Sequence, residues 1–174
     1  MNWHQSIFEL IDMRSFSNLW YWIALAVLWS TTSHWVLGVP YDLVQRARRQ
    51  GGQAEIDLED MVRINTNRLL YIGNTSGLWV IGFACFGLSM LVLLAFYYDF
   101  EFAQAVFLLA FPMSIIWLLS LSTARLIRSE EARGDALQKR LQRHRIYTQI
   151  IGMISIFITA MWGMFQNLTV GSIF

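Results

Sequence analysis

The chain has 174 residues, of which 56% are hydrophobic and only 14% charged, and its formal net charge is +1. Soluble domains carry about 25% charged residues, and a soluble protein of this length has too little interior to bury so much apolar surface. The composition therefore predicts an integral membrane protein, and the near-neutral charge gives no reason to expect a nucleic-acid partner. The single cysteine, Cys85, excludes an internal disulfide and a Cys-rich metal centre, so no metal site is predicted.

A short segment before the first long apolar stretch, residues 3–13, mixes apolar and acidic side chains. Ile7 and Phe8 stand beside Glu9 and Asp12, a spacing that gives a helix one apolar and one polar face. Helices of this kind lie in the plane of the membrane interface. We therefore predict an interfacial helix at the N-terminus.

Four stretches of the chain contain no Asp, Glu, Lys or Arg: 15–41, 69–98, 102–124 and 146–174. Each is longer than the ~20 residues that a helix needs to cross ~30 Å of hydrocarbon. Within them we predict four transmembrane helices, at 19–39, 77–97, 102–121 and 146–165. The sequence therefore predicts an all-α fold, an integral membrane four-helix bundle in which residues 1–174 form a single domain.

The first predicted span contains an uninterrupted polar run: Ser30, Thr31, Thr32, Ser33 and His34. Hydroxyl groups inside a helix can bond back to carbonyl groups one turn earlier, so polar packing is the favoured interpretation. Ionisable residues inside a membrane are nevertheless functional candidates, because placing them there is costly. The alternative interpretation is a path or binding site for protons, ions or another ligand.

Basic residues are distributed unevenly among the connections between the predicted spans. The connection between the first and second spans has five, the connection between the third and fourth spans has seven, and the rest of the chain has only Arg14. Lys and Arg are enriched in cytoplasmic loops. The distribution therefore places both of these connections in the cytoplasm and both chain termini on the periplasmic side of a bacterial inner membrane.

Both cytoplasmic connections are predicted to be helical and to be able to run on into the spans that follow them. We expect two i,i+4 ion pairs on them, Glu59 with Arg63 and Asp135 with Lys139. An acidic group on the first connection can face a basic group on the second and form a partner-binding extension of the bundle. The alternative is that both groups are solvated surfaces. The two groups are Glu55, Asp57, Glu59 and Asp60, and Lys139, Arg140, Arg143 and Arg145.

Small residues recur at helix-contact spacing in and beside two of the spans. Small side chains let helix backbones approach closely in lipid, so we predict that these positions pack against another helix. That helix belongs either to the same chain or to another protein, including a second copy of this one. The positions are Gly73, Gly77 and Gly82 near the second span, and Gly152, Ser155, Thr159 and Gly163 in the fourth.

Two histidines near the same membrane face, His34 and His144, raise the possibility of a haem clamped between helices. Two imidazoles alone are a weak signal, so no cofactor is predicted and haem is kept as an alternative. The sequence has no P-loop, dinucleotide-binding, zinc-protease or hydrolase motif. We therefore predict a non-enzymatic protein.

Two stretches of the chain carry a resemblance to a known family: FELIDMRSFSNLWYWIALAVLWSTTSHWVLGVPYD at 8–42 and FAQAVFLLAFP at 102–112. They resemble a family of small membrane proteins from alphaproteobacteria related to Rhodobacter, over nearly the full length. Members of that family are uncharacterised or are labelled as a component of the Suf-type iron–sulfur assembly complex. The resemblance implies an assembly partner, but a chain whose only thiol lies within a predicted span is not expected to hold a cluster itself.

These observations favour an accessory, assembly or scaffolding protein of a bacterial inner-membrane complex. Its expected partners are the lipid bilayer and either another membrane protein or a cytoplasmic complex. One alternative is a small oligomeric transporter or channel whose path is lined by the polar run from Ser30 to His34, with Asn74 and Thr75. The other is a haem-binding redox membrane protein that uses His34 and His144.

Overall fold

The computed structural model of the protein describes residues 15–171, with side chains up to Leu168, and it confirms that the chain is built from helices. The predicted interfacial helix at 3–13 lies outside the described residues. In chain order the elements are the 3₁₀ turn η1 (Ser15–Ser17), α2 (Leu19–His34), β1 (Trp35–Val36), β2 (Val39–Pro40), α3 (Tyr41–Gln50), α4 (Gln53–Thr75), α5 (Gly77–Val92), the π-helical turn η2 (Leu93–Tyr97), α6 (Glu101–Ser129) and α7 (Gly134–Gly171).

Within residues 15–171, three helices are long and apolar enough to cross a membrane: Gly77–Tyr97, Glu101–Ser129 and Gly134–Leu168. They contain the second, third and fourth predicted spans. The first predicted span is too long in the C-terminal direction, because α2 ends at His34 and not at Val39. Its 16 residues rise about 24 Å, which is less than the ~30 Å thickness of the hydrocarbon layer.

A two-stranded hairpin follows α2 and explains where that helix ends. Val36 and Val39 form one antiparallel pair and are fully buried. The two residues between them, Leu37 and Gly38, have φ angles of +53° and +74°, which is the left-handed geometry of a two-residue hairpin turn. Pro40 ends the hairpin and directly precedes α3. A proline favours an extended conformation in the residue before it, and here that residue is Val39 of the strand.

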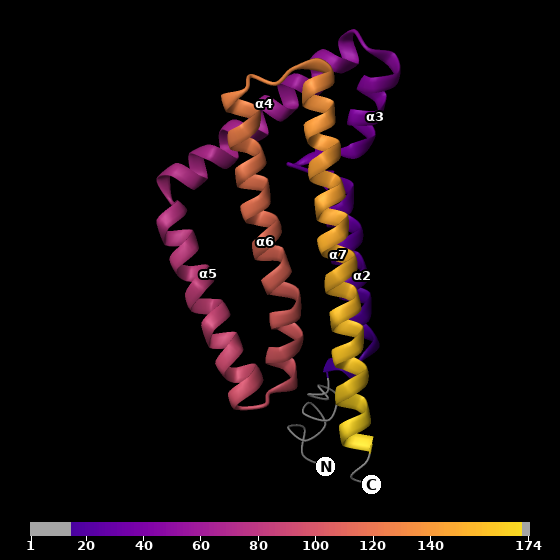
Figure 1. The fold of residues 1–174 in the computed structure, drawn as a ribbon, viewed down its shortest axis with the longest axis vertical. Helices are drawn as coiled ribbons and strands as arrows, with labels where there is room; N and C mark the ends of the chain where they lie inside the picture. The colour runs from indigo at the N-terminus through magenta and orange to yellow at the C-terminus, as the bar shows by residue number, and fades with distance from the viewer. Residues whose placement is uncertain (1–14, 172–174) are drawn as a thin grey trace, which may run out of the picture.

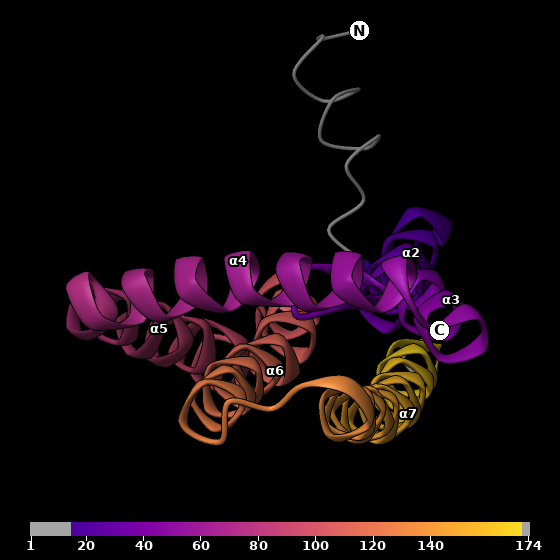
Figure 2. The same ribbon diagram turned by 90° about the horizontal axis from the view of Figure 1, so that it is seen from above.

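The two predicted cytoplasmic connections are helical, but they join the following spans differently. The second connection and the fourth span form one continuous helix, α7. The first connection does not run on, because the backbone leaves helical geometry at Ser76, where φ is −119° and ψ is 3°. Figure 1 shows the change of direction between α4 and α5, and Figure 2 shows α4 crossing from the end of α5 toward α2 and α3.

The helices are arranged unequally around α6 and α7. Helix α7 contacts α2 on one side and α6 on the other, and α6 in turn contacts α5. Helix α5 lies at the edge of the molecule in both ribbon views (Figures 1 and 2). Leu25, Trp29 and Ile116 form the apolar core where α2 and α6 meet. Helix α5 therefore has neighbours on only one flank.

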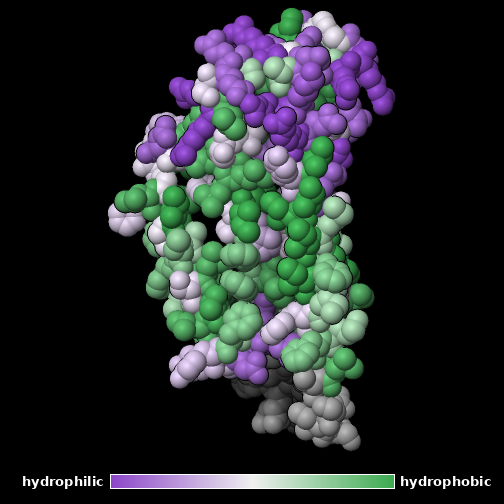
Figure 3. All heavy atoms as spheres, viewed as in Figure 1, coloured by the Kyte–Doolittle hydropathy of each residue, from purple (hydrophilic) through white to green (hydrophobic). Residues whose placement is uncertain are grey.

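Hydrophilic residues gather at one end of the molecule, where α3, α4 and the start of α7 lie, and hydrophobic residues cover the helices below it (Figure 3). We call α3, α4 and residues 134–145 of α7 the polar cap. The cap has an apolar core of its own, which ties it to the hairpin and to the end of α6. That core consists of Val36, Val39, Val44, Ala47, Leu58, Val62, Ile127, Leu137 and Leu141.

Candidate functional site

One member of the acidic group, Glu59, links two parts of the polar cap. Glu59 accepts a hydrogen bond from the backbone N–H of Gly134 at 2.8 Å, which joins α4 to the first residue of α7. Gly134 has a φ of +53°, so its position in this turn favours glycine. The prediction that Glu59 pairs with Arg63 is wrong, because Arg63 pairs with Asp60 at 2.9 Å.

Three members of the basic group of the cap, Lys139, Arg140 and Arg145, contact other neighbours. Lys139 lies 4.0 Å from Asp135, the i,i+4 pair that the sequence predicts. The guanidinium of Arg145 lies 3.7 Å from the centre of the Tyr41 ring, within the range of a cation–π contact. Among residues 15–171 no ion pair joins the acidic group to the basic group, which gives no support to the face-to-face arrangement of the two groups. Arg143 is exposed.

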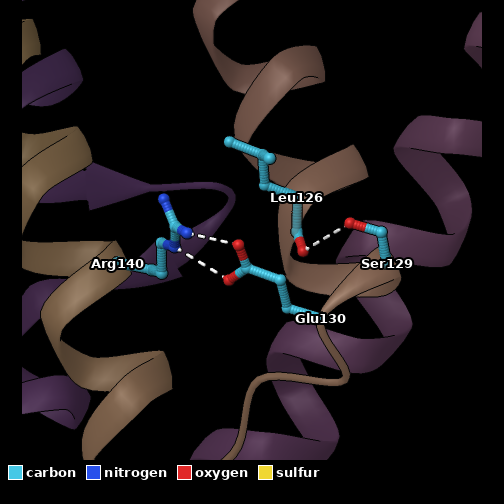
Figure 4. A network of polar contacts seen from close by, with 4 residues as sticks. All are labelled: Leu126, Ser129, Glu130 and Arg140. Atoms are coloured by element: carbon cyan, nitrogen blue, oxygen red, sulfur yellow. Dashed lines mark hydrogen bonds and ion pairs between the residues drawn. The ribbon is translucent and has the colours of Figure 1, made fainter.

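Arg140 makes the one two-bonded ion pair among the described residues. Both of its bonding nitrogens donate to Glu130, at the end of α6, and Nε lies 3.2 Å from the carboxylate (Figure 4). In the same turn the Ser129 hydroxyl donates to the carbonyl of Leu126 at 3.1 Å. This pair therefore connects the end of α6 to the second turn of α7.

Replacing Glu130 by glutamine is expected to lower the free energy of unfolding by less than about 1 kcal/mol, because ion pairs open to solvent contribute little. Both side chains are partly exposed. The measurement is a double-mutant cycle with Arg140→Gln, which isolates the coupling between the two residues. A coupling above about 2 kcal/mol would contradict this interpretation and would make the pair a main support of the cap.

The two histidines of the haem alternative have different neighbours. His144 is buried, and both of its ring nitrogens face hydroxyl groups of α6: Nδ1 is 3.0 Å from Thr123 and Nε2 is 3.4 Å from Ser120. His34 is half exposed and lies 3.9 Å from the carboxylate of Asp42. A haem held by both imidazoles would require His144 to give up a hydroxyl contact, so the geometry gives this alternative no support.

The side chains of the polar run of α2 are exposed or half-buried, and none of them is fully enclosed. Ser30 and Thr31 are exposed on the outside of the molecule, and Thr32 and Ser33 are half-buried. The hydroxyl of Thr32 bonds back to the carbonyl of Leu28 at 2.7 Å, as expected of a hydroxyl that satisfies itself within its helix. The run therefore has the geometry of polar packing and gives no support to a channel through a single copy of the chain.

The small residues of α7 contact large side chains of other elements. A Cβ atom added to Gly152 would lie 2.7 Å from Cε3 of Trp29, and one added to Gly163 would lie 3.2 Å from Cζ2 of Trp22. Ser155 and Thr159 are buried on the same helix. These glycines therefore leave the space that the indole rings of α2 fill.

The glycines near the second span fall into two kinds. A Cβ atom at Gly73 would meet Cδ1 of Leu121 at 2.8 Å, so α4 and α6 approach closely there. At Gly77, Gly82 and Gly87 an added Cβ would meet no atom of residues 15–168 within 4 Å. The structure thus gives Gly73 a packing neighbour in its own chain and leaves Gly82 bare.

Helix α5 presents most of its apolar surface to the outside. In the apolar 18-residue stretch of Gly77–Tyr97 only 6% of the residues are buried, against 22% in that of α6 and 28% in that of α7. Gly82, Cys85 and Ser89 are all exposed and share one helix face at i, i+3 and i+7. Phe86, also exposed, stands beside them. We call Gly82, Cys85 and Ser89 the bare face of α5.

One buried polar centre escaped the sequence analysis. Gln104 is 1% exposed; its amide nitrogen donates to the carbonyl of Ala95 and to Asp99, both at 2.9 Å. Its oxygen accepts from the indole N–H of Trp162 at 2.9 Å and from Gln166 at 2.6 Å. The side chain thus links η2, α6 and α7. The sequence did contain a signal for this centre, because Gln104 is the only amide side chain in the uncharged stretch 102–124.

Comparisons with family models, with curated proteins and with solved structures find no match to this chain. Among residues 15–171, no three His, Cys, Asp or Glu side chains lie close enough together to hold a metal ion. The bare face of α5 and the polar cap are therefore the features from which a function can be argued.

Proposed function

We propose that this chain is a four-span protein of a bacterial inner membrane that acts as a non-enzymatic accessory or assembly subunit. The observation that carries the proposal is the bare face of α5, which no other part of the described chain covers. The proposed partner is a membrane protein that places a helix against that face.

In this proposal α2, the first helix of the chain to be predicted as a span, joins the three long apolar helices as the remaining span. It is short for a membrane on its own, but η1 precedes it and the hairpin follows it directly. Trp20, exposed near its start, fits the headgroup level at which Trp rings are enriched. With α2 as a span, the chain alternates sides of the membrane and the polar cap lies in the cytoplasm. This placement agrees with the excess of basic residues in the cap.

The contrast between α7 and α5 supports a partner for α5. In lipid, helices associate through small residues that permit close approach, because lipid chains compete equally for apolar surface. Gly152 of α7 follows this rule inside the chain, where its missing side chain makes room for Trp29. Gly82 offers the same opening, which no described residue of the chain occupies. A helix of a partner protein could pack into the space beside Gly82.

A photo-crosslinking amino acid provides the test. Phe86, beside the bare face, and Phe157, on α7, are equally exposed at 66%, so benzoylphenylalanine at each position gives a matched pair. In native membranes we expect the probe at position 86 to crosslink a defined second protein and the probe at position 157 to react with lipid or not at all. Components of an iron–sulfur assembly complex are one identity to look for among the captured proteins.

Gly82→Leu is expected to reduce recovery of that partner about tenfold in mild detergent, because overpacking an interface costs about 1–3 kcal/mol. Gly87→Leu is the control, since Gly87 is also open but lies roughly 140° around the helix. The proposal is contradicted if both positions crosslink alike, or if position 86 captures only a second copy of this chain. The latter result would favour an oligomeric transporter or channel.

A further inference from the structure

A hollow of about 300 Å³ lies where α4, α6 and the hairpin meet. Asn65, Thr66 and Arg68 line it from α4, Trp117 and Ser120 line it from α6, and Gly38 lines it from the hairpin turn. Its volume falls at the lower end of the range for ligand pockets.

The charge of the hollow is purely positive. Arg68 is its only ionisable lining residue, and among residues 15–171 no carboxylate pairs with it. A second hollow, of about 430 Å³, has Arg63, Arg128 and Arg133 but also three carboxylates, which are Glu59, Asp60 and Glu131. The larger hollow therefore has no net preference for an anion, whereas the smaller one does.

Thr66, which lines both hollows, carries an unused hydrogen-bonding group. It is 3% exposed, and among the described residues its hydroxyl has no hydrogen-bond partner. A buried hydroxyl without a partner costs free energy, and a ligand oxygen recovers that cost once the side chains that enclose the hydroxyl move aside. The guanidinium of Arg68 and the hydroxyl of Thr66 are two donors of the kind that bind phosphate oxygens.

The hollow lies on the border between charged and uncharged sequence. Arg68 is the last charged residue before the uncharged stretch 69–98, in which Leu69 and Ile72 also line the hollow. Trp117 lies within the uncharged stretch of α6. The lining therefore combines a cationic and polar part with an apolar and aromatic part, which is the character of the membrane–water interface.

We infer that this hollow binds an anionic phospholipid. Its phosphate takes hydrogen bonds from Arg68 and Thr66, and the first part of an acyl chain lies against Ile72 and Trp117. The volume holds a headgroup phosphate and the start of a chain, with the rest of the chain in the bilayer. The inference rests on the membrane placement proposed above, and it is independent of the partner on α5.

Native mass spectrometry of the purified chain in detergent, titrated with phosphatidylglycerol, tests the inference. Arg68→Gln is expected to weaken binding of the first lipid about tenfold, the value of one hydrogen bond to a charged group. Arg68→Lys retains part of the affinity, because it keeps the charge and loses the planar fork. Thr66→Val, which has nearly the same shape, is expected to weaken binding about threefold.

Arg125→Gln is the control, because Arg125 is exposed on α6 at the matching end of its uncharged stretch and does not line the hollow. The inference is overturned if Arg68→Gln and Arg125→Gln have equal effects, or if lipid binding is unchanged in both Arg68→Gln and Thr66→Val. It is also overturned if inorganic phosphate displaces the lipid at equal concentration, since the ligand would then be a soluble anion. Because the purified chain is used, failure here leaves the crosslinking test on α5 unaffected.

Discussion

Replacing Gly152 by valine is expected to lower the free energy of unfolding by about 2–3 kcal/mol, because overpacking a filled interface forces side chains or backbone to move. The Cβ atom alone would lie 2.7 Å from Cε3 and 3.0 Å from Cζ3 of Trp29. Trp29 cannot yield easily, since it is 4% exposed and is held in a cluster with Leu25 and Ile116. The added side chain is expected to push α2 away from α7. The lower free energy of unfolding is measured by SDS-induced unfolding in mixed micelles.

Gly87→Val is the matched control for this prediction, because an added Cβ at Gly87 meets nothing within 4 Å. We expect it to change the free energy of unfolding by less than about 0.5 kcal/mol. Trp29→Ala should be strongly non-additive with Gly152→Val, because the smaller side chain removes the clash. Equal effects of valine at positions 87 and 152, or simple additivity with Trp29→Ala, would contradict close packing at Gly152.

The helical segments were predictable because charge and length alone specify them. The uncharged stretch 69–98 contains a membrane-length helix at Gly77–Tyr97, the residues that the sequence analysis proposed. The same reasoning misplaced the end of α2, because the uncharged stretch 15–41 continues beyond the helix. The relevant signals were Gly38 and Pro40, whose backbone preferences outweigh hydrophobicity.

The side-chain partners were less predictable, because they depend on how distant helices meet. Glu59 has Arg63 four residues away, yet its carboxylate caps Gly134, which is 75 residues distant. Spacing on one helix reports only the neighbours within that helix. Among the glycines, the sequence could not separate Gly152, which faces Trp29, from Gly82, which faces nothing in the described part of the chain. That difference is the basis of the proposed function.

Replacing Gln104 by leucine is expected to lower the free energy of unfolding by roughly 2–3 kcal/mol, a second large effect. Hydrogen bonds between side chains in membrane proteins average roughly 0.6 kcal/mol each. Gln104 makes three of them and a fourth bond to the backbone carbonyl of Ala95. The loss also leaves the indole N–H of Trp162 and the carbonyl of Ala95 without this partner in a buried place, which adds a desolvation cost. The unfolding titration in mixed micelles measures the effect.

Gln142→Leu is the control for Gln104, since Gln142 is exposed on α7 and is expected to change stability by less than about 0.5 kcal/mol. Gln104→Glu separates the donor from the acceptor role. It keeps the oxygen that accepts from Trp162 and Gln166, but it turns a carboxylate toward Asp99 in place of an amide N–H. Because like charges at that distance repel, we expect Gln104→Glu to be at least as destabilising as Gln104→Leu. A glutamate variant as stable as the wild type would show that the amide donor of Gln104 contributes nothing.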